Sequence, residues 1–165
     1  MLDPARIAAA VVGNGPAASR RVEQLKEGGA TKLAVFEVPP AAGALDGFDV
    51  VYVADLDRVQ SEQVAAMAHE AGALVNVEDV IDLCDFHVPG MVRRGDLLLT
   101  IATGGKSPGL ARALRRYFEA QFGPEWAGRL DELAAKRRQW MNEGADLPTL
   151  ARRTDAMIEE NGWLK

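Results

Sequence analysis

A glycine turn near the N-terminus has the spacing of a phosphate-binding loop. Residues 13–18, Gly-Asn-Gly-Pro-Ala-Ala, follow an apolar run and precede an amphipathic stretch, so the pattern is GxGxxA between a strand and a helix. Gly13 permits the tight turn, Gly15 lets backbone approach a pyrophosphate, and Ala18 allows the helix to pack closely on the strand. The free N–H groups at the start of that helix would bind the phosphates. A turn that only connects strand and helix can contain the same glycines, but the order of strand, turn and helix favours a dinucleotide site.

An acidic residue lies where such a site needs one. Glu37 ends the second apolar run, at about the spacing of 20 residues at which a carboxylate binds a ribose 2′-hydroxyl. The same charge would repel the 2′-phosphate of NADP, so the predicted cofactor is NAD. The predicted cofactor-binding residues are Gly13, Gly15, Pro16, Ala17, Ala18, Glu37, Val38, Ala54 and Asp55.

Asp79 is the second candidate for chemistry. It follows the fourth apolar run, and open α/β sheets bind their ligands at the carboxyl ends of their strands. Loss of a hydride from carbon becomes feasible when a base takes the accompanying proton, so a carboxylate beside a nicotinamide suits an oxidation. The alternative is an aspartate that only caps its loop.

Alternating apolar runs and amphipathic stretches must position these residues. Ser61 is expected to cap the second helix, and Ser107 with Pro108 to start the third. Strands that alternate with helices imply a parallel sheet with right-handed crossovers, so the predicted fold class is α/β and Rossmann-like, followed by a helical region. Strands are expected at 7–12, 33–38, 49–54, 73–77 and in the apolar run 96–103, and helices at 17–27, 61–70, 108–122, 126–142 and 148–160.

Composition limits the classes of partner and compartment. The 165 residues are 48% hydrophobic and 26% charged, as in ordinary globular proteins, and the net charge of -5 argues against a nucleic-acid partner. The single cysteine, Cys84, excludes an internal disulfide and fits a reducing compartment. Neither a leader peptide nor an apolar run of about 20 residues is found, so we expect a cytoplasmic protein without a membrane segment. His69 and His87 lack metal-ligand spacing, and no metal site is predicted.

Three segments further along resemble a known family. They are Asn76-Val-Glu-Asp79, Leu83-Cys-Asp-Phe86 with Pro89, and Thr100-Ile-Ala-Thr-Gly-Gly-Lys-Ser-Pro-Gly-Leu-Ala-Arg112. These segments are similar to the precorrin-2 dehydrogenase family, which includes the dehydrogenase–ferrochelatase part of siroheme synthase. The resemblance extends from the glycine turn to about residue 122, and more loosely through the remaining helices. The TGGxSPxLAR segment is its most specific part.

The resemblance implies an activity and an assembly. Members of the family oxidise precorrin-2 to sirohydrochlorin with NAD, and some also insert ferrous iron. By analogy residues 1–88 hold NAD, residues 89–122 form a homodimer, residues 123–165 form a helical region, and the tetrapyrrole binds between the two parts. Asp79 closes the family's VNxxD motif and is therefore the implied catalytic residue. The implied substrate-binding residues are Asn76, Thr103, Gly104, Gly105, Lys106 and Arg112.

The residues after position 100 also have a simpler interpretation. Lys106 and Arg112 could pair with the eight carboxylates of the macrocycle. A plain strand-to-helix turn with a solvated lysine would have the same sequence. Spacing alone leaves both interpretations open.

The chain departs from the family pattern in two places. Residues 39–47 are too few for the strand and helix that family members carry there, so an edge strand is expected to be missing. The proline that family members carry soon after the catalytic aspartate is replaced by Val80-Ile81-Asp82. The shortened sheet suggests an alternative function, a non-catalytic tetrapyrrole- or nucleotide-binding protein derived from the enzyme. A dehydrogenase of the same fold with another small substrate fits the TGGxSP segment less well.

Overall fold

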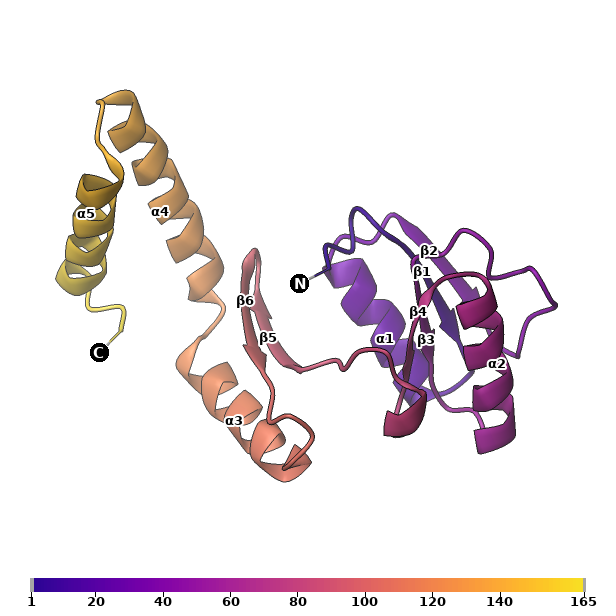
Figure 1. Ribbon diagram of the computed structural model, residues 1–165. Helices are drawn as coiled ribbons and strands as arrows, with labels where there is room; N and C mark the ends of the chain where they lie inside the picture. The colour runs from indigo at the N-terminus through magenta and orange to yellow at the C-terminus, as the bar shows by residue number, and fades with distance from the viewer. Residues whose placement is uncertain (1, 165) are drawn as a thin grey trace. The chain divides into compact units, whose positions relative to one another are not determined.

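The computed structural model describes residues 2–164, which divide into two compact units between Val88 and Pro89 (Figure 1). The first boundary coincides with the predicted end of the cofactor domain. The second unit is continuous across position 122, where a further boundary was expected. A separate dimerisation segment therefore stays a prediction.

The first unit is a parallel sheet with a helix on each face. Its strands lie in the order β2-β1-β3-β4. Alternate residues of β1 pack in two separate clusters, one with α1 and one with α2, so both faces of the sheet are covered (Figure 1). Burial on both faces explains why the strands are continuous apolar runs. The elements are β1 (Ala8–Val12), α1 (Pro16–Glu27), β2 (Lys32–Phe36), β3 (Val50–Val53), α2 (Arg58–Glu70) and β4 (Leu74–Val77). The predicted α/β, Rossmann-like fold is confirmed.

The sheet ends at β2. Within the described residues β2 pairs only with β1, and turns carry the chain from residue 37 to β3. The expected loss of an edge strand is therefore confirmed. Val35 on this outermost strand is 51% exposed.

The start of α2 differs from the prediction. Asp57, not Ser61, is its N-cap: the Asp57 carboxylate accepts the amide of Gln60 at 2.8 Å, and the Gln60 side chain completes a capping box. Ser61 is buried inside the helix. The prediction of Ser61 was wrong because two cap-forming residues lie four positions apart, and only Asp57 is followed by a glutamine three residues later.

The second unit joins a hairpin to three helices. They are β5 (Gly90–Arg94), β6 (Leu97–Ile101), α3 (Pro108–Gln121), α4 (Glu125–Asn142) and α5 (Leu147–Glu160). Ser107 caps α3 as predicted, because its hydroxyl accepts the amide of Leu110 at 3.2 Å. The sequence did not reveal β5, which pairs antiparallel with β6. Arg94 belongs to that strand, and its guanidinium donates to the carbonyl of Phe122 at 2.7 Å, where it satisfies the end of α3.

Among residues 2–164, no helix combines the length and the apolar character needed to cross a membrane.

Candidate functional site

The glycine turn brings the ends of β1 and β3 together. Gly13 has a φ of +140°, and a Cβ built on it would overlap the carbonyl oxygen of Ala54 at the end of β3. The amide of Gly13 also donates to the carbonyl of Phe36 at 2.8 Å, which fixes the turn against β2. Only glycine fits this position, since any side chain would separate the two strand ends.

The helix that follows the turn already binds an anion. The carboxylate of Asp55 accepts the amides of Ala17 at 2.8 Å and Ala18 at 2.9 Å. These belong to the first turn of α1, whose amides have no partner within the helix. Gly15 supplies no side-chain cap of its own. The amides therefore have the chemistry of a phosphate site, and a carboxylate of the chain itself occupies them.

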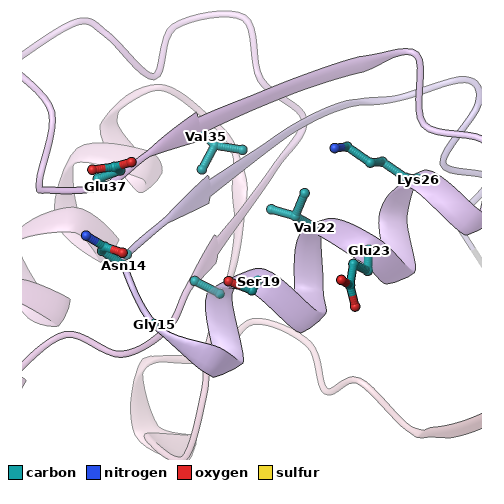
Figure 2. A pocket seen from close by; sticks show the side chains of 10 residues that line it. Asn14, Gly15, Ser19, Val22, Glu23, Lys26, Val35 and Glu37 are labelled. Atoms are coloured by element: carbon teal, nitrogen blue, oxygen red, sulfur yellow. The ribbon is translucent and has the colours of Figure 1, made fainter.

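A cavity of about 310 Å³ opens beside the turn, between α1 and β2. Figure 2 shows Glu37 and Asn14 at one end and Lys26 at the other, with Val22 and Val35 between them. This size lies at the lower limit of ligand pockets, about 300 Å³, and suits one end of a dinucleotide. The lining residues are Gly13, Asn14, Gly15, Ala18, Ser19, Val22, Glu23, Lys26, Val35 and Glu37.

The structure brings only part of the predicted cofactor set to this cavity. Gly13, Gly15, Ala18 and Glu37 line it. The remaining five lie around it in different ways. Pro16 and Ala17 open α1, Val38 is exposed beyond Glu37, Ala54 is buried against the turn, and Asp55 binds the α1 amides.

Several lining residues were not predicted. Val22 and Lys26 follow the predicted Ala18 at intervals of four along α1, so the three residues share one face of the helix. That spacing is visible in the sequence and could have identified them. Asn14 lies between the two glycines, so a prediction that included every residue of the turn would have identified it.

Asp79 stands apart from the hydrogen bonds of its own loop. It is the second residue after β4, is exposed, and has a φ of +64°, in the left-handed region. Non-glycine residues seldom adopt this conformation, which recurs at functional sites. Among residues 2–164 the side chains that hydrogen-bond to the backbone of this segment belong to other residues, namely Asn76, Cys84 and Asp85. The loop-capping alternative therefore finds no support in the contacts, and the catalytic role stays a prediction.

Asp85 is the main anchor of the loop after β4. Its carboxylate accepts the amide of Val75 at 2.8 Å and lies 3.0 Å from Nε2 of His69. The backbone hydrogen bond from Val75, and then the contact with His69, hold the pKa of Asp85 below its ordinary value. These two contacts explain the presence of an aspartate after Cys84 in this segment.

Two more side chains of the segment hold the loop from inside. The Asn76 side chain, 8% exposed, donates to the carbonyl of Phe86 at 2.9 Å. The thiol of Cys84 lies 3.2 Å from both the amide and the carbonyl oxygen of Val77. Asn76 therefore uses its amide group within the loop, and its predicted contact with substrate stays a prediction.

The acidic neighbours of Asp79 are held in ion pairs. Glu78 lies 3.2 Å from Arg20 of α1, and Asp82 lies 2.6 Å from Arg58 of α2. The hydrogen bond from Arg58 lowers the pKa of Asp82. No ion pair involves Asp79 among the described residues. Of the three carboxylates, Asp79 is the one without such a partner.

The remaining predicted residues belong to the second unit. The Thr103 hydroxyl donates to the carbonyl of Ser107 at 3.2 Å and closes a loop. Gly104 and Gly105 have φ values of +58° and +75°, with open space where a Cβ would point. Lys106 in this loop and Arg112 on α3 are exposed. The structure thus brings these five residues to one loop and the helix that follows it.

Comparison with known proteins places the chain in a family. Residues 31–90 match the family described as "Putative NAD(P)-binding". The chain is 32% identical over 147 residues to the siroheme synthase of Nitrosococcus oceani, covering 78% of this chain and 31% of that protein. It is 30% identical over 173 residues to that of Psychromonas ingrahamii, covering 93% of this chain and 36% of that protein. The chain belongs to the precorrin-2 dehydrogenase and siroheme synthase family.

A solved structure agrees in fold. The chain described as SirC, precorrin-2 dehydrogenase, superposes with a TM-score of 0.73 at 20% identity, covering 100% of this chain and 91% of that one. The predicted family and fold are confirmed, and so is a nicotinamide-dinucleotide-binding domain. This chain spans only about a third of the length of the siroheme synthases cited above. Their activity as whole proteins is therefore a matter for proposal.

The part of the chain described by the structure offers no preformed metal centre. Within residues 2–164 no group of three or more His, Cys, Asp or Glu side chains is arranged to hold a metal ion.

Proposed function

We propose that this protein is an NAD-dependent precorrin-2 dehydrogenase that produces sirohydrochlorin. One observation carries the proposal: the sheet gathers the glycine turn and Asp79 at a single edge. Strands β1, β3 and β4 are adjacent and parallel, so Gly13, Asp55 and Asp79 all follow carboxyl ends of neighbouring strands. Family membership then supplies the substrate class.

The residues around the turn fit a dinucleotide. The α1 amides bind the Asp55 carboxylate, which lies in front of Gly15, and Glu37 borders the cavity. The amides of Ala17 and Ala18 would hold the pyrophosphate once the Asp55 carboxylate has moved. Glu37 would accept a hydrogen bond from a ribose hydroxyl.

The oxidation removes a hydride and a proton from precorrin-2. NAD, when bound, supplies the hydride acceptor. Asp79 would take the proton, because it is an exposed carboxylate without an ion-pair partner among residues 2–164. Asp85, Cys84 and Asn76 would position it by fixing the loop that follows β4.

The second unit would supply substrate contacts and the dimer. Lys106 and Arg112 are exposed cations that would pair with the carboxylates of the tetrapyrrole, and Gly104 and Gly105 would admit the macrocycle to the backbone. Exposed apolar side chains on α3 would form the homodimer. We place the protein in the cytoplasm, a reducing compartment that fits its single cysteine.

A second candidate is a binding protein derived from the enzyme and without dehydrogenase activity. The missing edge strand and the carboxylate on the phosphate-binding amides favour it. Purified protein incubated with NAD and precorrin-2 separates the two. Appearance of the sirohydrochlorin spectrum together with NADH supports the enzyme. Binding of precorrin-2 without a spectral change supports the binding protein, and adding ferrous iron to the product tests chelation.

A further inference from the structure

Asp55 lies where the proposed dinucleotide would place a phosphate. Its Oδ2 accepts the amides of both Ala17 and Ala18, at 2.8 and 2.9 Å. Amides in the first turn of a helix carry partial positive charge and are the groups that bind pyrophosphate in such turns. The carboxylate and the pyrophosphate therefore need the same two donors.

The space in front of the turn is taken as well. A Cβ built on Gly15 would lie 2.5 Å from both Cγ and Oδ2 of Asp55. The carboxylate thus packs directly on the backbone that a glycine at this position leaves open for a ligand. Neither the donors nor the room beside Gly15 are free while Asp55 holds this position.

The connection from β3 to α2 is built to deliver this carboxylate. Asp55 has a φ of +58°, a left-handed conformation that aspartate tolerates better than most residues. Two residues later, Asp57 caps α2, the helix of its own connection. Two aspartates of one short segment therefore cap two different helices. Asp55 follows β3 and caps α1, the helix that follows the neighbouring strand β1.

We propose that Asp55 is an internal competitor for the dinucleotide, which caps α1 in the free protein and must turn away before the pyrophosphate binds. This inference rests on the proposed function. Displacing the carboxylate breaks two hydrogen bonds and brings two anions toward one helix end, so the affinity for NAD is lower than the turn alone would allow. If the turn is open about a tenth of the time, the affinity falls about tenfold.

The test is calorimetric titration of NAD into the full chain and three variants. Asp55→Asn removes the charge and keeps the shape and the tolerance for positive φ, whereas Asp55→Gly removes the side chain and relieves φ. Both should bind NAD about tenfold more tightly than the unchanged protein. Asp55→Gly should also melt at a lower temperature without NAD, because α1 loses its cap, and Asp55→Asn should melt closer to the unchanged protein, because its amide oxygen still accepts a hydrogen bond. Asp57→Asn makes the same change of charge at the α2 cap and should leave NAD affinity unchanged.

Binding as tight or tighter in the unchanged protein than in both Asp55 variants would overturn the inference and make Asp55 a cofactor ligand. Titration with inorganic pyrophosphate distinguishes failure of the competition by Asp55 from failure of the proposed function. If none of the proteins binds NAD, the proposed cofactor is wrong. Pyrophosphate that then raises the melting temperature of Asp55→Asn, but not of the unchanged protein, still supports competition. No effect on either protein overturns it.

Discussion

The carboxylate of Asp85 and the amide of Val75, 2.8 Å apart, tie the loop after β4 back to the strand from which it leaves. The bond spans ten residues and closes the loop that carries Asp79. His69 of α2 lies 3.0 Å from the same carboxylate, so the loop is also bound to the helix. Asp85 is therefore a positioning residue for the candidate site.

Asp85→Asn should lower the free energy of unfolding by about 1–2 kcal/mol at neutral pH, since a hydrogen bond to a charged acceptor is lost. The difference should depend on pH. The folded protein lowers the pKa of Asp85, so its contribution is complete above the ordinary aspartate pKa of about 3.9 and is lost as the pH falls below it. Urea unfolding at pH 7 and at about pH 3 measures both effects. A difference between the two proteins that is unchanged at the lower pH would contradict the assignment.

Gly13→Ala should lower the free energy of unfolding by about 3 kcal/mol or more, because the added methyl group overlaps the backbone of Ala54 and φ is positive. Gly47→Ala is the matched control. Gly47 has a φ of +81° but open space around a Cβ, so only the backbone strain of about 1–2 kcal/mol is expected. Equal losses of unfolding free energy in the two variants, measured by urea unfolding, would show that the backbone of Ala54 moves aside without loss of stability.

NAD should bind at least about tenfold more tightly than NADP, because Glu37 repels a 2′-phosphate; tenfold corresponds to about 1.4 kcal/mol. Glu37→Gln should lower the ratio of NAD affinity to NADP affinity, because it removes the charge that repels the 2′-phosphate. Glu23→Gln removes a carboxylate from the same cavity, outside the predicted ribose contact, and should leave the ratio unchanged. Calorimetry with both cofactors makes the comparison, and equal affinities in the unchanged protein would refute the role of Glu37.

Light scattering should find a dimer at micromolar concentration. Leu110 and Tyr117, seven residues apart on one face of α3, are 51% and 58% exposed. The buried hydrophobic side chains of the second unit within residues 2–164 are few: Val92, Ile101, Trp126 and Leu150. Leu110→Glu should halve the mass, whereas Val59→Glu, on an exposed site of α2, should not. A monomeric unchanged protein would contradict the proposal.

Local signals in the sequence predicted most of the sheet and the glycine turn. Gly13 and Glu37 are recognisable because strand, turn and acidic residue follow one another within one βαβ unit. The partner of the α1 amides was not predicted, because Asp55 meets Ala17 across 38 positions and only through the pairing of β1 with β3. The contact of Arg94 with the end of α3 was not predicted either, since the two lie 28 positions apart in the sequence.

The loop after β4 shows a similar limit. Its motif residues could be recognised in the sequence, but the sequence did not show which of them hold the loop and which is left exposed. Asn76 and Asp85 are both polar and close to Asp79, yet the structure engages their side chains in holding the loop. Only the tertiary contacts distinguish an aspartate that anchors a loop from one that is left exposed.

Asp79→Asn should leave the fold and the affinity for NAD nearly intact, because asparagine has almost the same shape and tolerates a φ of +64°. Turnover of precorrin-2 should fall by roughly 10²–10⁴-fold, the range for a lost general base. Asp79→Ala should lose the same activity and also about 1 kcal/mol of stability from the strained backbone. The matched controls are Glu78→Gln and Asp82→Asn, whose exposed ion pairs with Arg20 and Arg58 contribute little stability. Sirohydrochlorin formation is followed for all four variants. An active Asp79→Asn beside an inactive neighbour variant would move the catalytic assignment to that neighbour.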